Sequence, residues 1–174
     1  MLLKGFAPQP RPYMNKDLLF KTIDEWKEGT EEFYDQDTID EDIYDIIKSH
    51  KKDQPEGVNL YSYDAYDIAK KLDDEGYDIT ITEVHDIDEL LSKCTHALNE
   101  AVCEWVKEND IKPKFEVGKK ADFNYYNGKT KNGVVSGFVE STAKYKVSFN
   151  DDGSEKITLI EYEVLEEKNG IKTI

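Results

Sequence analysis

The spacing of apolar residues changes near Pro113, and this change constrains the fold more than any other feature of the sequence. From Ile87 to Val106 apolar residues recur at helical spacing, which predicts a long amphipathic helix. After Pro113 apolar and polar residues alternate between glycine-containing turns, which predicts short antiparallel strands. We therefore expect an α+β protein in which a mainly helical part precedes a strand-rich part.

The part before Pro113 is predicted to form helices with an apolar stripe on one side. Side chains that can cap a helix, and glycines that can end one, mark their bounds. The marks are Asn15 and Gly29 for the first helix, Thr38 with Glu41 for the second, about 61–75 followed by Gly76 for the third, and Asp86 with Glu89 for the fourth.

The segment Tyr77–Val84 alternates apolar and polar residues and is rich in β-branched side chains. This pattern predicts a strand between the third and fourth helices. A single strand cannot satisfy its own backbone hydrogen bonds, so it must pair with another segment. The candidate partners are the Pro-rich arm at the start of the chain, residues 57–61 and a second copy of the protein.

The part after Pro113 is predicted to form short strands at regular spacing, which suggests a small barrel. Two glycine-containing pairs, Asn127-Gly128 and Asp152-Gly153, are expected to form the tight turns. The predicted strands are Lys120–Tyr126, Gly133–Ser141, Lys144–Asn150 and Glu155–Ile160.

Residues in this last third resemble Tudor and KOW domains. Val117–Tyr125 is similar to their opening strand, and Val164-Leu165 is similar to their closing segment. Gly133–Val135 and Tyr145–Ser154 are similar to their second and third strands and the following turn. The resemblance covers less than a third of the chain, and it implies a five-stranded SH3-like barrel. It also implies a binding module for nucleic acid or for methylated or basic peptides.

The resemblance implies a ligand surface made of aromatic and lysine side chains. Aromatic rings could surround a methylated cation, or stack on bases while lysines contact phosphates. Many Tudor domains have an aromatic residue where this chain has Lys131-Asn132. An alternative is that the lysines only face solvent or the acidic part of the chain. The candidate residues are Tyr125, Tyr126, Lys129, Lys131, Tyr145 and Phe149, with Phe138 as a further member of a cage.

The excess of negative charge is confined to the helical part. Residues 1–110 contain 12 Lys and Arg against 28 Asp and Glu, whereas residues 111–174 contain 11 against 10. A surface of this sign repels nucleic acid and membranes and attracts basic protein surfaces. The predicted organisation is an extended Pro-rich arm at 1–14, an acidic helical domain with one short strand at 15–111, and a Tudor/KOW-like barrel at 112–174.

Rows of acidic side chains on the helices are the candidate partner-binding face. Side chains three or four positions apart on a helix lie about 5–6 Å apart, and a nucleic-acid duplex carries one charge per about 3.4 Å of each strand. The two charge densities are similar, so the acidic face could imitate nucleic acid, or it could serve only solubility. The candidate residues are Asp35, Asp37, Asp40, Glu41, Asp42 and Asp45, with Asp73, Asp74 and Glu75 as a second cluster.

The sequence contains no pattern that predicts a cofactor, a metal site or an enzyme. It lacks a glycine-rich phosphate loop, a nucleophile elbow and paired metal ligands. Cys94 and Cys103 fall on one predicted helix, roughly 13 Å apart, which is too far for a disulfide between them. Reduced cysteines, and the absence of a signal-peptide or membrane-spanning pattern, favour a cytoplasmic protein.

The leading hypothesis is a non-enzymatic regulator or inhibitor, of a kind often encoded by phages. Its acidic helical surface would bind a basic nucleic-acid-binding protein in place of nucleic acid. One alternative is a nucleic-acid-binding module that acts through the barrel. Another is a virion or assembly protein in which Tyr77–Val84 forms an interface between copies.

Overall fold

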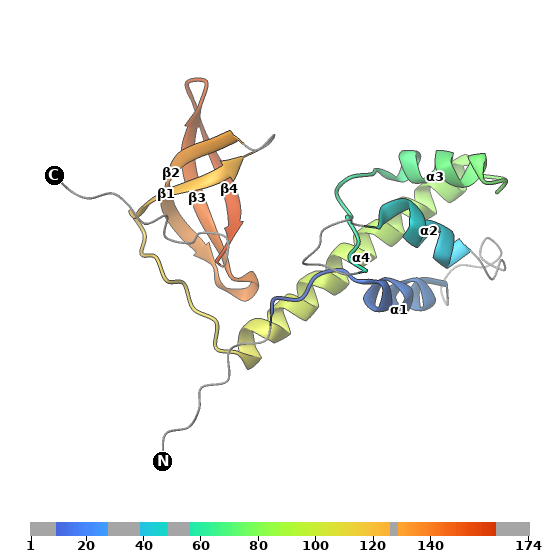
Figure 1. The fold of residues 1–174 in the computed structure, drawn as a ribbon, viewed down its shortest axis with the longest axis horizontal. Coiled ribbons are helices and arrows are strands. Elements are labelled where there is room, and N and C mark those ends of the chain that lie inside the picture. Colours follow the sequence, from blue (N-terminus) through green and yellow to red (C-terminus); the bar gives the residue numbers. More distant parts are fainter. Residues whose placement is uncertain (1–9, 28–38, 49–55, 126–128, 163–174) are drawn as a thin grey trace, which may run out of the picture. The chain divides into compact units, whose positions relative to one another are not determined.

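The computed structural model describes residues 10–27, 39–48, 56–125 and 129–162. The chain divides into two compact units, Met1–Trp105 and Val106–Ile174. Figure 1 shows helices in the first unit and an antiparallel sheet in the second. The predicted α+β class is therefore confirmed.

The first unit is built from four helices in its described part. They are α1 (Lys16–Lys27), α2 (Ile39–Ile47), α3 (Ala65–Asp74) and α4 (Ile81–Glu108), whose last residues extend into the second unit. Each helix contributes its apolar stripe to one core. The buried members from the helices are Leu19, Ile23, Trp26, Ile39, Ile43, Ile47, Ala65, Ile68, Ala69, Leu72, Ile87, Leu90 and Cys94.

Two helix starts show how well local capping signals predict the bounds. The Asn15 side chain accepts a hydrogen bond from the backbone N–H of Leu18 at 2.9 Å, so its predicted capping role is confirmed. The third helix begins later than predicted, at Ala65, because the Asp64 side chain accepts from the Asp67 N–H at 2.9 Å and so caps it there. The marks at Gly29 and Thr38 lie outside the described residues.

The predicted strand at Tyr77–Val84 is wrong. Residues 77–80 have no regular structure, and α4 already begins at Ile81. The reason is a capping box: the Glu83 carboxylate accepts a hydrogen bond from the Thr80 N–H at 2.8 Å, and the Thr80 hydroxyl accepts from the Thr82 N–H at 3.2 Å. Asp86 therefore lies inside the helix and does not cap it.

The end of the N-terminal arm is held by backbone hydrogen bonds to residues 56–58. The Val58 N–H donates to the Met14 carbonyl at 2.8 Å, and the Lys16 N–H donates to the Glu56 carbonyl at 3.0 Å. On the other side, the Asn59 N–H donates to the Ile47 carbonyl at 2.8 Å. This short connection therefore joins the start of α1 to the end of α2.

The second unit contains a four-stranded antiparallel sheet in the order β1-β2-β3-β4. The strands are β1 (Lys120–Tyr125), β2 (Lys129–Val139), β3 (Lys144–Asp151) and β4 (Ser154–Glu161), and a short 3₁₀ turn, η2 (Glu140–Thr142), joins β2 to β3. All four predicted strands are confirmed, although β2 begins earlier than expected. Asn127-Gly128 and Val164-Leu165 lie outside the described residues.

β2 has two local features where it pairs with β3. Its register with β3 shifts between Val135 and Gly137, as in a β-bulge. A Cβ atom on Gly133 would lie 2.5 Å from a methyl carbon of Val147 and 2.9 Å from the Ser148 carbonyl oxygen. Only glycine allows this close approach of β2 to β3.

Thr80→Ala should destabilise the helical unit by about 1 kcal/mol, because the start of α4 loses its cap. Urea unfolding of the full chain measures this change. Thr82→Ala removes the same atoms two residues further along and is the matched control. An equal loss of stability in the two variants would contradict the capping role of Thr80.

Candidate partner-binding surfaces

The acidic residues of α2 have partners within the helical unit. Asp40, Glu41 and Asp42 lie in the first turn of α2, where the helix dipole favours negative charge. The contacts are Lys27–Asp40 at 2.6 Å, Lys16–Glu41 at 2.7 Å, Lys48–Asp45 at 2.9 Å, and a hydrogen bond from the Tyr77 hydroxyl to Asp42. The hydrogen bond to Glu41 also raises the pKa of Lys16. These four carboxylates thus have a structural explanation; Asp35 and Asp37 lie outside the described residues.

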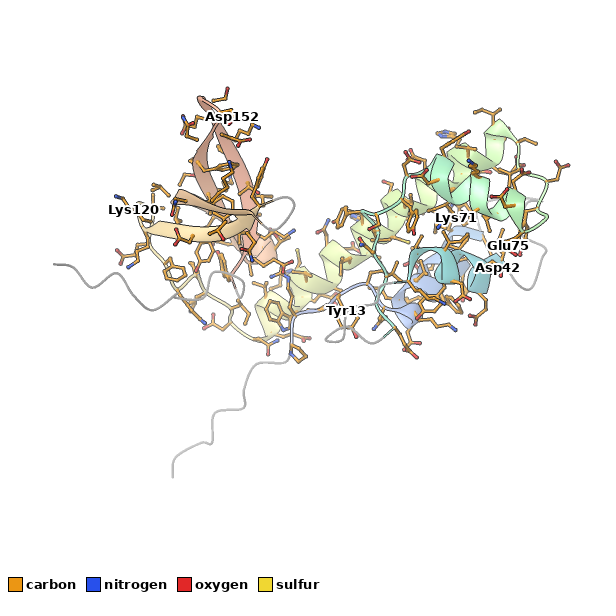
Figure 2. All side chains as sticks on the ribbon, turned by 45° about the horizontal axis from the view of Figure 1, so that its top comes forward. Tyr13, Asp42, Lys71, Glu75, Lys120 and Asp152 are labelled. Carbon is orange, nitrogen blue, oxygen red and sulfur yellow. The ribbon has the colours of Figure 1, made fainter. Side chains whose placement is uncertain are left out.

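The second predicted cluster, at the end of α3, differs from the acidic residues of α2 in its position on the helix and in its ion pairs. Asp73, Asp74 and Glu75 are exposed, and none of them forms an ion pair with another described residue. Asp73 and Asp74 are the last two residues of α3, where the helix dipole disfavours negative charge. Figure 2 labels Glu75 at this end of α3 and Asp42 on α2. Local helix stability therefore gives no reason for carboxylates at this position.

The charge excess of the helical part cannot be neutralised within that part. It contains 28 acidic side chains and 12 basic ones, so 16 carboxylates would remain even if every Lys and Arg were paired with a separate acid. Ion pairs such as those of α2 use basic residues that are then not available to the other acids. The remaining negative charge can be balanced only by groups outside that part, such as solvent ions, lysines of residues 111–174 or a basic partner.

Two of the six residues of the predicted ligand surface are buried, and two, Tyr125 and Lys131, are partly exposed. Tyr145 is fully buried, and its hydroxyl oxygen accepts hydrogen bonds from the backbone N–H groups of Lys114 at 2.8 Å and Phe115 at 3.1 Å. Phe149 is also buried. Tyr126 lies outside the described residues, and for Lys129 only the backbone is described. Two of the predicted ligand residues are therefore core residues of the sheet.

The aromatic candidates for a methyl-cation cage fall into two groups. Tyr125 packs against Phe149 with ring centroids 5.0 Å apart, and both rings contact Phe123. Phe138 packs instead against Tyr145 at 5.9 Å. Each group fills part of the core with edge-to-face contacts. The structure thus explains these rings as packing residues.

A charged cluster that the sequence did not reveal lies on the aromatic side of the sheet. Asp151 accepts hydrogen bonds from Lys156 at 2.6 Å and Lys131 at 2.9 Å. These two contacts, with Lys156 the stronger cause, lower the pKa of Asp151 to about 2. The same contacts raise the pKa values of both lysines. Lys131, a predicted ligand residue, is therefore already paired. The alternation of residues in β3 places Asp151 on the same side as Phe149 and could have indicated this pairing.

The chemistry of the remaining groups gives no sign of a reactive site in the described residues. Cys94 is buried in the helical core, and burial raises the pKa of its thiol to about 12. The described residues contain no group of three His, Cys, Asp or Glu side chains that could hold a metal ion. No helix among them combines the length and apolar composition needed to cross a membrane.

Comparison with known proteins assigns the chain to no family. No protein-family model, no curated protein and no solved structure matches it. The resemblance to Tudor and KOW domains therefore remains a prediction from the residues that carry it.

Asp151→Asn should lower the midpoint of thermal unfolding at neutral pH, because Lys131 and Lys156 then lose the negative carboxylate with which both of them pair. The pKa of Asp151 falls from its ordinary value of 3.8 to about 2 on folding. The stabilisation is therefore complete well above pH 3.8 and is lost as the pH falls through about 2. Thermal unfolding across this range should show that the two proteins become equally stable at the acidic end.

Asp152→Asn is the matched control for this prediction, because it removes the same charge from the neighbouring exposed position. We expect a smaller change of thermal midpoint with little dependence on pH. A constant difference between wild type and Asp151→Asn over the whole acidic range would contradict the role of the ionised carboxylate.

Proposed function

We propose that the helical unit binds a basic surface of a partner protein and that the end of α3 is the centre of the contact. The partner would be a nucleic-acid-binding protein, and the carboxylates would take the place of phosphates. The protein would act as a non-enzymatic regulator or inhibitor, of a kind often encoded by phages. The acidic part of the chain supplies a charge of the required sign and size.

The observation that carries this proposal is the contrast between α2 and α3. The carboxylates of α2 lie in a favourable first turn and have partners, so they stabilise the fold. Asp73 and Asp74 lie in the last turn of α3, where each negative charge is unfavourable by about 0.3–1 kcal/mol. A feature that is unfavourable for stability and exposed to solvent is typical of a binding site.

For the second unit we propose the SH3-like barrel of Tudor and KOW domains. The antiparallel order β1-β2-β3-β4 is consistent with that architecture, and the strand bounds agree with the residues that carry the resemblance. The fifth strand would come from Val164-Leu165, outside the described residues. The unit would add a second contact to the partner.

The two alternative functions have less support from the contacts. Nucleic-acid binding through the predicted surface would need Tyr145 and Phe149, which are buried, and Lys131, which is paired with Asp151. An assembly interface through Tyr77–Val84 would need a strand, but Ile81–Val84 is helical.

The triple variant Asp73→Asn, Asp74→Asn, Glu75→Gln tests the proposal. The full chain would first be used to isolate partners from a nuclease-treated lysate of the native host, and the retained partner would then be purified. We expect duplex DNA to compete for this partner. We expect the variant to bind it at least about tenfold more weakly, because a charge pair at contact distance contributes on the order of 1 kcal/mol in water. Calorimetry would measure the affinities.

The matched control is Asp17→Asn, Asp24→Asn, Glu25→Gln, which removes two Asp and one Glu from exposed positions of α1. It should have a smaller effect on binding. The α3 variant should keep or gain thermal stability, since its carboxylates oppose the helix dipole. Equal losses in both variants would show that only total charge matters, and a partner that duplex DNA does not displace would contradict nucleic-acid mimicry.

A further inference from the structure

Two tyrosine side chains are exposed at the start of α3 and in the turn before it. Tyr61 is 81% exposed and Tyr66 is 66% exposed. Neither side chain forms a hydrogen bond or a ring contact with another described residue. Packing within the helical unit therefore does not explain these two rings. Tyrosine is one of the residues that most often contribute strongly to binding at protein interfaces.

Tyr66 lies on the same side of α3 as Asp73. The two residues are seven positions apart, which corresponds to about two helical turns and about 10 Å along the axis. Lys70 lies between them, four positions after Tyr66. A different side of α3 is turned to the core, with the buried residues Ala65, Ile68, Ala69 and Leu72. The exposed side of α3 thus has an aromatic ring at its start and carboxylates at its end.

The charges on this segment, with both signs counted, select a basic partner. Residues 61–78 contain six acidic residues and two lysines, a net charge of −4. Lys71 is half-buried and lies over the ring of Tyr63, and Lys70 is the exposed lysine. A surface of this sign attracts cations and repels nucleic acid. The acidic residues, all of them exposed, are Asp64, Asp67, Asp73, Asp74, Glu75 and Asp78.

The helical unit already places cations of its own over aromatic rings. The Lys16 ammonium lies 5.0 Å from the ring centroid of Tyr44 and also pairs with Glu41. The Lys71 ammonium lies 4.1 Å from the ring centroid of Tyr63. Such contacts are favourable because the face of an aromatic ring is negative. The exposed ring in the first turn of α3 has carboxylates beside it but no cation over it from the described residues.

We propose that Tyr66 receives an arginine side chain of the basic partner, so that the exposed side of α3 binds an arginine-rich segment. This inference rests on the function proposed above and specifies which basic residue the partner supplies. A guanidinium group is planar and weakly hydrated, so it can stack on a ring and still donate hydrogen bonds to carboxylates. A lysine ammonium is compact and strongly hydrated, and it gains less from the ring. A second arginine, about 10 Å further along, would pair with Asp73.

An NMR titration of the full chain with two synthetic peptides tests this proposal. The peptides have the same length and charge, and one carries arginine wherever the other carries lysine. We expect both peptides to shift the amide resonances of Tyr66 and Asp73, because both are attracted by the carboxylates. The arginine peptide should bind about two- to fivefold more tightly, which is the gain expected from one exposed contact between a cation and a ring.

Tyr66→Leu should remove the preference for the arginine peptide, because leucine keeps an apolar side chain without an aromatic ring. Tyr66→Phe is the matched control, because it keeps the ring and should keep the preference. Tyr61→Leu makes the same change at the exposed tyrosine outside α3 and should also keep the preference. Both tyrosines are exposed, so thermal unfolding of the three variants should match that of the wild type.

The triple variant Asp73→Asn, Asp74→Asn, Glu75→Gln separates this inference from the proposed function. It should weaken the binding of both peptides to a similar extent and leave the preference for arginine in place. If the triple variant bound both peptides as tightly as the wild type, the acidic end of α3 would be excluded as the centre of the contact, and the proposed function would fail.

Other outcomes would overturn the role of Tyr66 and leave the proposed function intact. These are equal affinity of the wild type for the two peptides, and a preference for arginine that survives in Tyr66→Leu. No shift of the Tyr66 resonance at saturating peptide would also remove the arginine site. Shifts that depend on protein concentration alone would assign the ring to a second copy of the chain.

Discussion

The burial of the α4 apolar stripe is the interaction on which the helical unit depends. Ile87, Leu90 and Cys94 are almost fully buried in the core that also contains the stripes of α1, α2 and α3. Full burial of one such side chain contributes about 1.5–3 kcal/mol. The spacing of these residues places them on one side of the helix, and the capping box of Thr80 and Glu83 determines where the helix begins.

Negative charge is used in two ways in this unit. On α2, carboxylates lie in a first turn, and Lys16 and Lys27 neutralise two of them, so they stabilise a short helix with a very apolar inner side. At the end of α3, Asp73 and Asp74 oppose the helix dipole and remain exposed. The difference is informative because stability explains the first group and fails to explain the second. The proposed binding of a basic partner would account for the second group and for the overall excess of acid.

The two faces of the sheet show a similar contrast. On the face that carries Tyr125 and Phe149, the side chains contact one another: Asp151 pairs with Lys131 and Lys156, and the rings pack together. The opposite face exposes the apolar side chains of Val134, Ile157 and Leu159 together with charged side chains of both signs, such as Lys120, Lys146, Asp122 and Glu155. In the described part of the chain the sheet therefore packs its own core on one face and exposes charged and apolar side chains on the other.

Sequence alone determined the features that depend on neighbours along the chain. The change of period near Pro113, the Asn15 cap and the four strand positions follow from contacts between residues a few positions apart. The prediction of a strand at Tyr77–Val84 was wrong because an alternating pattern over so few residues also fits a loop followed by the start of a helix. The capping box of Thr80 and Glu83 favours the helix start. Only the tertiary structure decided which carboxylates are paired, which rings are buried and which face of the sheet is exposed. Those properties depend on residues far apart in sequence, such as Lys16 with Glu41 and Lys131 with Asp151, and a local pattern gives at most the face of a strand on which a residue lies.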